Sequence, residues 1–392
     1  MTPAFDRATP VADIVAYVDA VRRRPVRRNE LVELLAEQAP LYAGRGTNEA
    51  ERLRGYMLAS FQAIGLPPAA MHYVLEELQT GLNPYTVAAA AKALRGAANP
   101  PDAVVRLLLL AIDRIKSGDD AVCFDSYAPS ARPAPATALA ELFRTLAWLG
   151  SRAAAARQTL AAMLDNEAEG FSASVRRELA EALEAVSLPA APAGSCCAGP
   201  EPALPAGHVA GVHAFAACAD GIEGLELQDQ NGALLTFGEF FRGRPSIMTF
   251  FYTRCMNPEK CSLTITKLAR LQKRISDDRL QGRFNVAALS YDPAYDLPQR
   301  LRAYGADRGM TFDARNRLLR TTGPFEPMRR YFDLGVGYGA VTVNRHRLDL
   351  FILDAAGRPC ADFTRLLWSE DEVLSALIAA ARTTSGAQMS AG

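Results

Sequence analysis

The stretch FFYTRCMNPEKCSLT, residues 250–264, places two cysteines where an apolar strand pattern gives way to an amphipathic helix pattern. After the second cysteine, apolar residues recur at spacings of three and four, as a helix requires. Asn257 and Pro258 suit the helix start as N-cap and first helical residue. We therefore expect Cys261 in the first turn and Cys255 just ahead of it, where free backbone N–H groups and the helix dipole favour thiolate over thiol. Thiolates attack disulfides and bind soft metals.

Further motifs around this stretch occur in an order typical of one protein family. They are LQDQNG at 227–232, YTRC at 252–255, LSYDPAYDLP at 289–298, RAY at 302–304, and His346 shortly before FILDAAG at 351–357. From about Glu223 to about Ala380 the chain resembles the Sco/SenC proteins, which are thioredoxin-like domains associated with copper delivery. The resemblance implies a thioredoxin-like α/β fold for this part of the chain.

The resemblance also implies a copper site. In the Sco/SenC family two cysteines and one histidine bind a single copper ion, which carries over onto Cys255, Cys261 and His346. Two thiolates and an imidazole form a soft donor set suited to Cu(I), and a fourth ligand would accommodate Cu(II). The family usually has three residues between its cysteines, whereas this chain has five, Met256–Lys260, and so a larger loop.

The C-terminal part of the chain alternates strand and helix patterns. We expect a hairpin over 225–237, strands at 245–252 and 284–290, helices near 297–305 and 324–333, a second hairpin from 348, and a final helix at 370–382. This order suits a thioredoxin-like sheet. Asp292 and Asp296 are expected beside the cysteines, in the loop after the central strand, where they could pair with Arg254 or Arg300.

The N-terminal part is rich in Ala and Leu and almost devoid of strand patterns. Helices are expected at 10–24, 29–42, 47–64, 68–80, 85–96, 101–117, 136–149, 152–165 and 172–187. The segment 83–97 resembles HEAT-type repeats, in which paired helices stack into a solenoid, although a compact helical bundle fits the same pattern. No catalytic constellation is visible here. His72 is interpreted as a packing residue and Cys123 as inert.

A Pro-, Ala- and Gly-rich stretch, residues 189–207, has the composition of a linker. Its adjacent thiols Cys196 and Cys197 have no packing reason to be there, so they either exchange metal or disulfide with Cys255 and Cys261 or are incidental. The residues that follow, His208, His213 and Cys218, match no zinc-site spacing.

The sequence thus predicts four parts. They are an all-α helical repeat domain at 1–188, a linker at 189–222, a Sco/SenC-like thioredoxin domain at 223–382 and a disordered tail at 383–392.

Composition excludes some classes of protein. Forty-three basic residues balance forty-three acidic ones, which argues against a broad nucleic-acid footprint. No apolar run approaches the roughly 20 residues that span a bilayer, and the N-terminus lacks a secretory signal pattern. We therefore expect a cytoplasmic protein without a membrane span. Its seven cysteines would then be buried residues or redox and metal groups rather than a disulfide framework.

Two functions compete on this evidence. In the first, the protein binds copper through Cys255, Cys261 and His346 and delivers it to a protein partner docked on the helical part. In the second, it is a thiol–disulfide oxidoreductase in which Cys255 attacks and Cys261 resolves the mixed disulfide, so that whether the protein is an enzyme stays open. A third possibility makes the helical part functional and the other a scaffold. Copper binding is favoured because dithiol exchange does not need His346.

Overall fold

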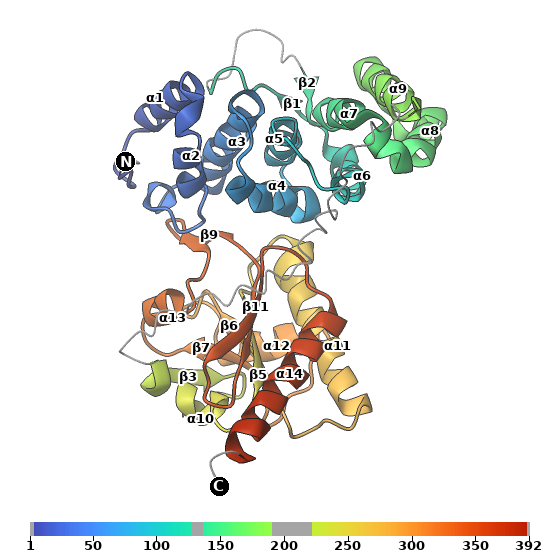
Figure 1. Cartoon of the computed structure of the whole chain (residues 1–392). Coiled ribbons are helices and arrows are strands. Elements are labelled where there is room, and N and C mark those ends of the chain that lie inside the picture. Colours follow the sequence, from blue (N-terminus) through green and yellow to red (C-terminus); the bar gives the residue numbers. More distant parts are fainter. Residues whose placement is uncertain (1–3, 128–135, 190–221, 390–392) are drawn as a thin grey trace. The chain divides into compact units, whose positions relative to one another are not determined.

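A computed structural model of the chain describes residues 4–127, 136–189 and 222–389. The chain divides into two compact units, Met1–Pro205 and Ala206–Gly392, here called the helical unit and the sheet unit (Figure 1). Within the described residues no helix combines the length and the apolar sequence that crossing a bilayer requires.

Helices of the helical unit follow the predicted segments. Their bounds are α1 Val11–Arg22, α2 Asn29–Leu34, α3 Thr47–Ile64, α4 Pro68–Thr80, α5 Pro84–Leu94, α6 Val104–Ile115, α7 Ala138–Leu149, α8 Arg157–Asp165 and α9 Ala173–Ser187. The helix expected at 29–42 is shorter than predicted, because it ends at Leu34 and a 3-10 turn begins at Pro40, where proline cannot continue a helix. A two-stranded ladder, β1 (Ala121–Val122) with β2 (Ala136–Thr137), is a small exception to the expected all-α fold.

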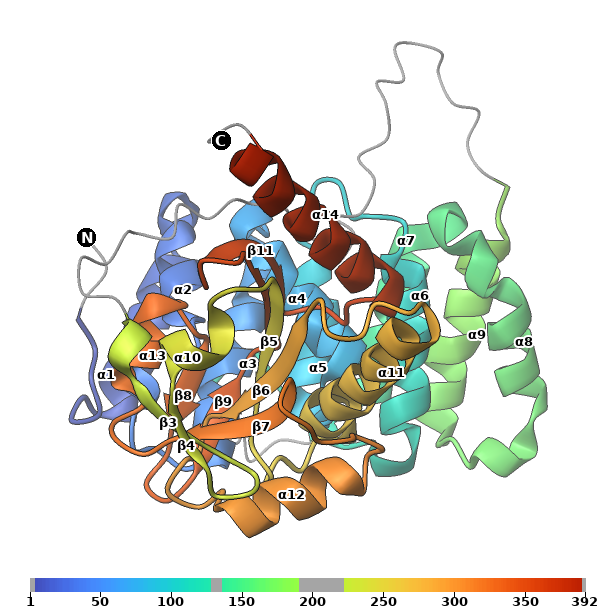
Figure 2. The same ribbon diagram turned by 90° about the horizontal axis from the view of Figure 1, so that it is seen from below.

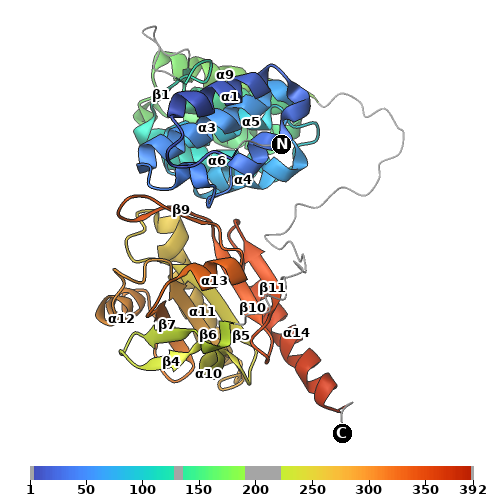
Figure 3. The same ribbon diagram turned by 90° about the vertical axis from the view of Figure 1, so that its left-hand side faces the viewer.

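The helices stack in two layers. Contacts link α1 to α3, α3 to α5, α5 to α7 and α7 to α9 in one layer, and α2 to α4 and α4 to α6 in the other (Figure 3). Small residues permit the close packing of α3 on α5: a Cβ on Gly55 would lie 2.6 Å from the Tyr85 ring, and the alanines at 88–91 are fully buried. Such layering is what paired helical repeats produce. A HEAT-type repeat stays a prediction.

The sheet unit is built on a seven-stranded sheet in the order β11-β10-β5-β6-β7-β3-β4. The strand bounds are β3 Glu226–Asp229, β4 Leu234–Thr236, β5 Ser246–Phe251, β6 Asn285–Ser290, β7 Asn316–Thr321, β10 Asp349–Leu353 and β11 Pro359–Thr364. The three central strands β5, β6 and β7 run parallel, and the other pairings are antiparallel. Figure 2 shows α11 (Leu263–Asp277) and α12 (Pro298–Ala306) beside these central strands. This mixed sheet confirms the predicted thioredoxin-like α/β fold.

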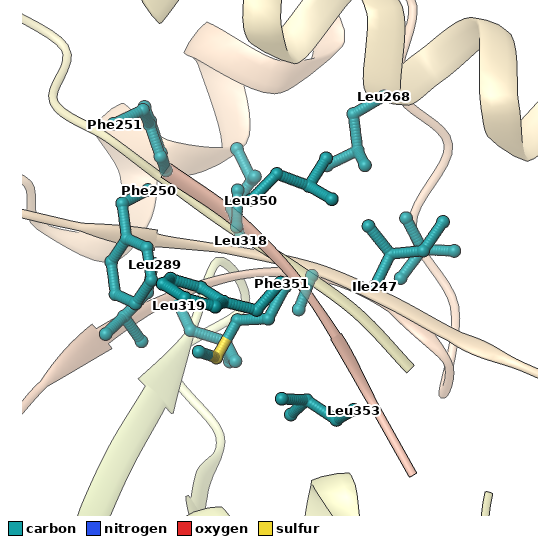
Figure 4. Close-up of a cluster of buried hydrophobic side chains, with 14 of the residues drawn as sticks. Ile247, Phe250, Phe251, Leu268, Leu289, Leu318, Leu319, Leu350, Phe351 and Leu353 are labelled. Carbon is teal, nitrogen blue, oxygen red and sulfur yellow. The ribbon is translucent and has the colours of Figure 1, made fainter. Parts of the chain in front are cut away.

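Central strands β5 and β6 are buried at every position. Such continuous burial is expected for parallel strands covered on both faces. Side chains of neighbouring strands meet in the core, as Figure 4 shows for Phe250 of β5 and Phe351 of β10, whose ring centroids are 6.1 Å apart. The core fixes the end of β5, where the cysteine loop begins.

Several elements differ from the prediction. The sequence analysis predicted helix α13 (Glu326–Tyr331) but missed three other elements. These are strand β7, the short helix α10 (Phe237–Phe241), and the hairpin of β8 (Val336–Tyr338) with β9 (Val343–His346). The final helix α14 extends from Glu370 to Met389, so the prediction of a disordered tail is wrong for 383–389. No proline interrupts the chain there, which allows the helix to continue. Residues 390–392 and most of the predicted linker lie outside the described residues.

Candidate metal centre

The cysteine loop connects β5 to α11. Asn257 caps the helix start as predicted, because its side chain accepts a hydrogen bond of 2.9 Å from the backbone N–H of Glu259. The first turn, Pro258–Ser262, is a π-helical turn rather than the expected α-helical one. Such wide turns are rare and occur frequently at functional sites. Cys261 lies within this turn and Cys255 lies ahead of it, as the sequence indicates.

His346 is the last residue of β9, whose pairing with Val336 of β8 holds its backbone. Its Nδ1 lies 3.0 Å from the carbonyl oxygen of Arg347, which accepts a hydrogen bond from an Nδ1–H. The rings of Tyr252 and Tyr291 flank the imidazole with centroids 5.4 and 5.5 Å away. These contacts fix the ring and leave Nε2 as the nitrogen available to a ligand.

The structure brings the three predicted residues together. Nε2 of His346 lies 3.5 Å from Sγ of Cys255 and 3.4 Å from Sγ of Cys261. All three atoms lie within 4.8 Å of one another, and no other such group of histidine, cysteine or acidic ligands occurs among the described residues. Cys261 is fully buried, His346 is 4% exposed and Cys255 is half-buried. The three residues therefore form a largely buried set of soft donors, of which Cys255 is the most exposed.

The two thiols differ in acidity. Hydrogen bonds that the Cys255 sulfur receives from Cys261 and then from His346 lower the pKa of Cys255 far below that of a free thiol. Burial, and next the hydrogen bond and charge of Cys255, raise the pKa of Cys261 well above its usual value. The prediction that the helix start favours the thiolate is therefore wrong for Cys261, because burial outweighs the dipole there. In the metal-free site, one sulfur ionises easily and the other with difficulty.

Arg254 connects the cysteine loop to the hairpin that carries His346. Its guanidinium forms a salt bridge with Asp292, with Nε 3.1 Å from Oδ2, and also donates to the carbonyl oxygen of Val341 at 3.1 Å. Val341 lies between β8 and β9. The predicted pairing of Asp292 with Arg254 is thus confirmed. The Arg254 side chain also links the cysteine loop to the hairpin that carries His346.

Asp296 holds the start of the cysteine loop through buried hydrogen bonds. It is fully buried and accepts a hydrogen bond of 3.1 Å from the backbone N–H of Thr253, and its carboxylate also binds the hydroxyl of Ser290. Burial raises the pKa of Asp296 above its ordinary value. Arg300 donates to the carbonyl of Tyr295 at 2.5 Å, so it does not provide the pairing considered for it. The carboxylate holds the loop backbone rather than a metal.

The remaining predicted cysteines lie elsewhere or outside the described residues. Cys360 is exposed on β11 and donates to the carbonyl of Ile352 at 3.4 Å, and Cys123 is half-buried in the helical unit. His72 packs against Tyr73 with ring centroids 4.2 Å apart, which agrees with a packing role. Outside the described residues are Cys196, Cys197, His208, His213 and Cys218.

One residue of the site was missed by the sequence reasoning. Lys260 lies between the two cysteines and its Nζ donates to the carbonyl oxygen of His346 at 2.9 Å. A lysine in a loop usually predicts a solvated side chain. The only available signal was its position directly before Cys261, and that signal acquires meaning only when the fold brings His346 alongside.

Comparison with known families agrees with the resemblance. Residues 220–373 match the family described as SCO1/SenC. This match lies in the sheet unit. No curated protein matches the chain.

Solved structures similar to the sheet unit include several Sco proteins. A SCO1/SenC family lipoprotein from Bacillus anthracis is 20% identical, with 40% of this chain and 92% of that chain covered and a TM-score of 0.35. Copper-bound ScoI of Bradyrhizobium japonicum is 23% identical, with 40% of this chain and 98% of that chain covered and a TM-score of 0.31. Copper-bound ScoI of Arabidopsis thaliana is 20% identical, with 42% of this chain and 99% of that chain covered and a TM-score of 0.33.

Proposed function

We propose that the SCO1/SenC-like region, residues 220–373, binds one copper ion through Cys255, Cys261 and His346 and holds it as cargo for a protein partner. The observation that carries this proposal is the meeting of three soft donor atoms within 4.8 Å of one another. Thiolates and imidazole are the donors that favour copper over the hard cations Mg²⁺ and Ca²⁺. Two similar solved structures, the ScoI proteins of Bradyrhizobium japonicum and Arabidopsis thaliana, hold bound copper, which supports the choice of this metal.

The residues fit such an ion. The Nδ1–H of His346 donates to a backbone carbonyl, and Nε2 is the imidazole nitrogen that faces the two sulfurs and would bind the ion. Cys255 is the more acidic thiol and supplies the first thiolate. A bound cation would favour loss of the second proton from Cys261, because metals bind cysteine as thiolate. When bound, the ion would supply a soft Lewis acid that holds both sulfurs.

Delivery requires that the ion can leave as well as bind. Cys255 is half-buried whereas Cys261 is fully buried, so a thiol of an acceptor protein would reach the Cys255 side first. Met256, which follows Cys255, is 89% exposed, so the chain next to Cys255 lies at the surface. We propose that the acceptor docks on the helical unit, since stacked helical layers provide an extended surface for a protein partner.

Thiol–disulfide exchange is the second candidate, and the unequal acidity of the two thiols favours it. The Cys255 thiolate would attack a substrate disulfide and release one substrate thiolate. Cys261, after losing its proton, would attack the Cys255 sulfur and release the second, so that the substrate gains two electrons and the pair becomes a disulfide. Equilibration with glutathione buffers tests this function: a pair that stays reduced at every attainable potential would eliminate it.

The substitution His346→Ala tests the copper site without touching the thiols. We expect anaerobic titration against a chromogenic Cu(I) competitor to show binding weakened by at least roughly tenfold, since even changes behind the ligands typically cost 10–100-fold. His72→Ala serves as the matched control, because His72 packs on Tyr73 in the helical unit. Equal affinities of the parent and His346→Ala would contradict the assignment of His346 as a ligand.

A further inference from the structure

Asp349, the first residue of β10, carries a carboxylate that is fully buried. Its Oδ1 accepts a hydrogen bond of 2.5 Å from Nε of Arg347, and its Oδ2 accepts one of 3.1 Å from the hydroxyl of Tyr291. Both oxygens therefore have partners. The guanidinium of Arg347 supplies the positive charge that a buried carboxylate requires.

Both partners of this carboxylate also contact His346. Tyr291 lies beside the imidazole, with ring centroids 5.5 Å apart. Arg347 provides the backbone carbonyl oxygen that lies 3.0 Å from Nδ1 of His346. With its two oxygens, Asp349 thus holds the residue that flanks the ring and the residue that accepts the hydrogen bond of the ring.

Arg347 is fixed by its backbone as well as by its side chain. Its backbone N–H donates to the carbonyl oxygen of Gly335 at 2.8 Å, and its Nη2 donates to the carbonyl oxygen of Asp333. A Cβ on Gly335 would lie 2.5 Å from Cδ of Arg347, so the arginine packs directly on this glycine. Because Arg347 lies between β9 and β10, these contacts fix the peptide group whose oxygen accepts from the imidazole.

The hydroxyl of Tyr291 has two acceptors within reach but only one hydrogen to donate. It lies 3.1 Å from Oδ2 of Asp349 and 3.4 Å from the carbonyl oxygen of Arg347. The closer acceptor is the carboxylate, which also carries the negative charge. Asp349 therefore directs the tyrosine hydrogen to itself and leaves the Arg347 carbonyl to the imidazole of His346.

The orientation of this imidazole decides whether the site has a nitrogen donor. In the present orientation Nε2 lies 3.5 Å from Sγ of Cys255 and 3.4 Å from Sγ of Cys261. A half-turn of the ring about its Cβ–Cγ bond would exchange Nε2 with Cε1, and the ring would then present carbon to the sulfurs. The hydrogen bond from Nδ1 to Arg347 is lost in the same half-turn, so that bond selects the orientation that can bind a metal.

We propose that Asp349 is a positioning residue of the metal centre, which orients His346 through Arg347 and Tyr291 so that Nε2 faces the two sulfurs. The inference rests on the proposed copper site and adds to it a residue that is not a ligand. A carboxylate that merely stabilised the connection between β9 and β10 would leave the hydrogen bond of the imidazole unchanged when its charge is removed.

Two substitutions test this role. Asp349→Asn removes the charge that holds Arg347 and nearly keeps the shape, and Tyr291→Phe removes the hydroxyl but keeps the ring. Asp229→Asn is the matched control, because the Asp229 side chain is 4% exposed on β3 and pairs with Arg317 at 3.1 Å. In the sheet, β3 is separated from β10 by three strands, so the control breaks a buried ion pair away from the site.

The first arm uses the metal-free, full-length protein labelled with ¹⁵N-histidine. The chain has four histidines, and His346→Ala identifies the signal of His346. NMR measures how fast the Nδ1–H proton of His346 exchanges with water, which is slow while the hydrogen bond holds. We expect exchange to become faster by about tenfold or more in Asp349→Asn and by a smaller factor in Tyr291→Phe. Asp229→Asn should keep the parent rate.

The second arm measures the Cu(I) dissociation constant of the same proteins by anaerobic competition. Residues that orient a metal-binding histidine typically contribute 10–100-fold to affinity, so Asp349→Asn should bind Cu(I) at least about tenfold more weakly. Tyr291→Phe should change in the same direction by a smaller factor, because the ring still flanks the imidazole. Asp229→Asn should bind as the parent does.

Parent-like exchange and affinity in Asp349→Asn would overturn the inference while the copper site stands, and so would equal changes in Asp229→Asn. Backbone amides of β5 report whether each variant is folded. If Asp349→Asn does not fold, Tyr291→Phe decides: faster exchange of the His346 proton supports the inference, and a parent-like rate overturns it. Absence of copper binding in the parent would overturn the proposed function, and the exchange arm would still decide whether Asp349 orients His346.

Discussion

Replacing Cys255 by serine is expected to weaken Cu(I) binding by more than about 100-fold. Changes behind metal ligands typically cost 10–100-fold, and losing a ligand costs more. Serine has nearly the shape of cysteine but offers a hard oxygen, which is a poor donor for Cu(I). Cys255 is also the sulfur whose pKa is lowered, so its loss removes the thiolate that forms first. Anaerobic competition against a chromogenic Cu(I) ligand measures the change.

Cys360→Ser is the matched control for this substitution. Cys360 is a free thiol on the same unit, exposed on β11, and it donates to a backbone carbonyl rather than to the site. Its replacement should leave the dissociation constant within about twofold of the parent. Similar losses in Cys255→Ser and Cys360→Ser would mean that copper binds to thiols in general, not to a built site.

Replacing Phe250 by alanine is expected to destabilise the sheet unit by about 3–5 kcal/mol, the usual cost of deleting a buried phenylalanine. Phe250 is 1% exposed on β5 and lies among the buried side chains of the core (Figure 4). Its ring lies 5.6 Å from Tyr291, 5.8 Å from Phe332 and 6.1 Å from Phe351. Because the cysteine loop begins directly after this strand, the cavity would also loosen the site.

Urea unfolding followed by tryptophan fluorescence can isolate this unit. The chain has two tryptophans, Trp148 in the helical unit and Trp368 in the sheet unit. In a Trp148→Phe background the signal comes from Trp368 alone, which is 2% exposed and sensitive to unfolding. Leu234→Ala is the control, since Leu234 is 67% exposed and should change stability by less than about 0.5 kcal/mol. An unchanged unfolding midpoint for Phe250→Ala would contradict the core assignment.

The sequence was sufficient for those elements whose own residues carry a clear pattern. Strand β5 is mostly apolar, and Asn257 and Pro258 mark the helix start after it, so the junction was predictable from local chemistry. Strand β7 was missed because its sequence, NRLLRT, includes two arginines, which do not suit a buried strand. The fold gives those arginines partners that lie far away in the sequence: Arg317 pairs with Asp229, and Arg320 with Gln228.

The residues of the candidate site were predictable from the sequence, but the directions of their pKa shifts were not. The family resemblance supplied the histidine, whereas local reasoning on the helix start predicted an ionised Cys261. The structure buries Cys261 completely and gives the lower pKa to Cys255. Burial of a residue depends on which residues pack over it. At this site the packing residues come from distant parts of the chain: Cys255 and His346, which lie side by side, are about 90 residues apart in the sequence. Lys260 was missed for the same reason.

X-ray absorption spectroscopy at the copper edge tests the central claim most directly. One equivalent of Cu(I) is added to a protein that carries Cys196→Ser and Cys197→Ser, so that these two thiols do not compete. Binding at Cys255, Cys261 and His346 predicts two sulfur neighbours and one imidazole nitrogen around the ion. A copper environment with one sulfur or none, or without the imidazole signature, would contradict the proposed site.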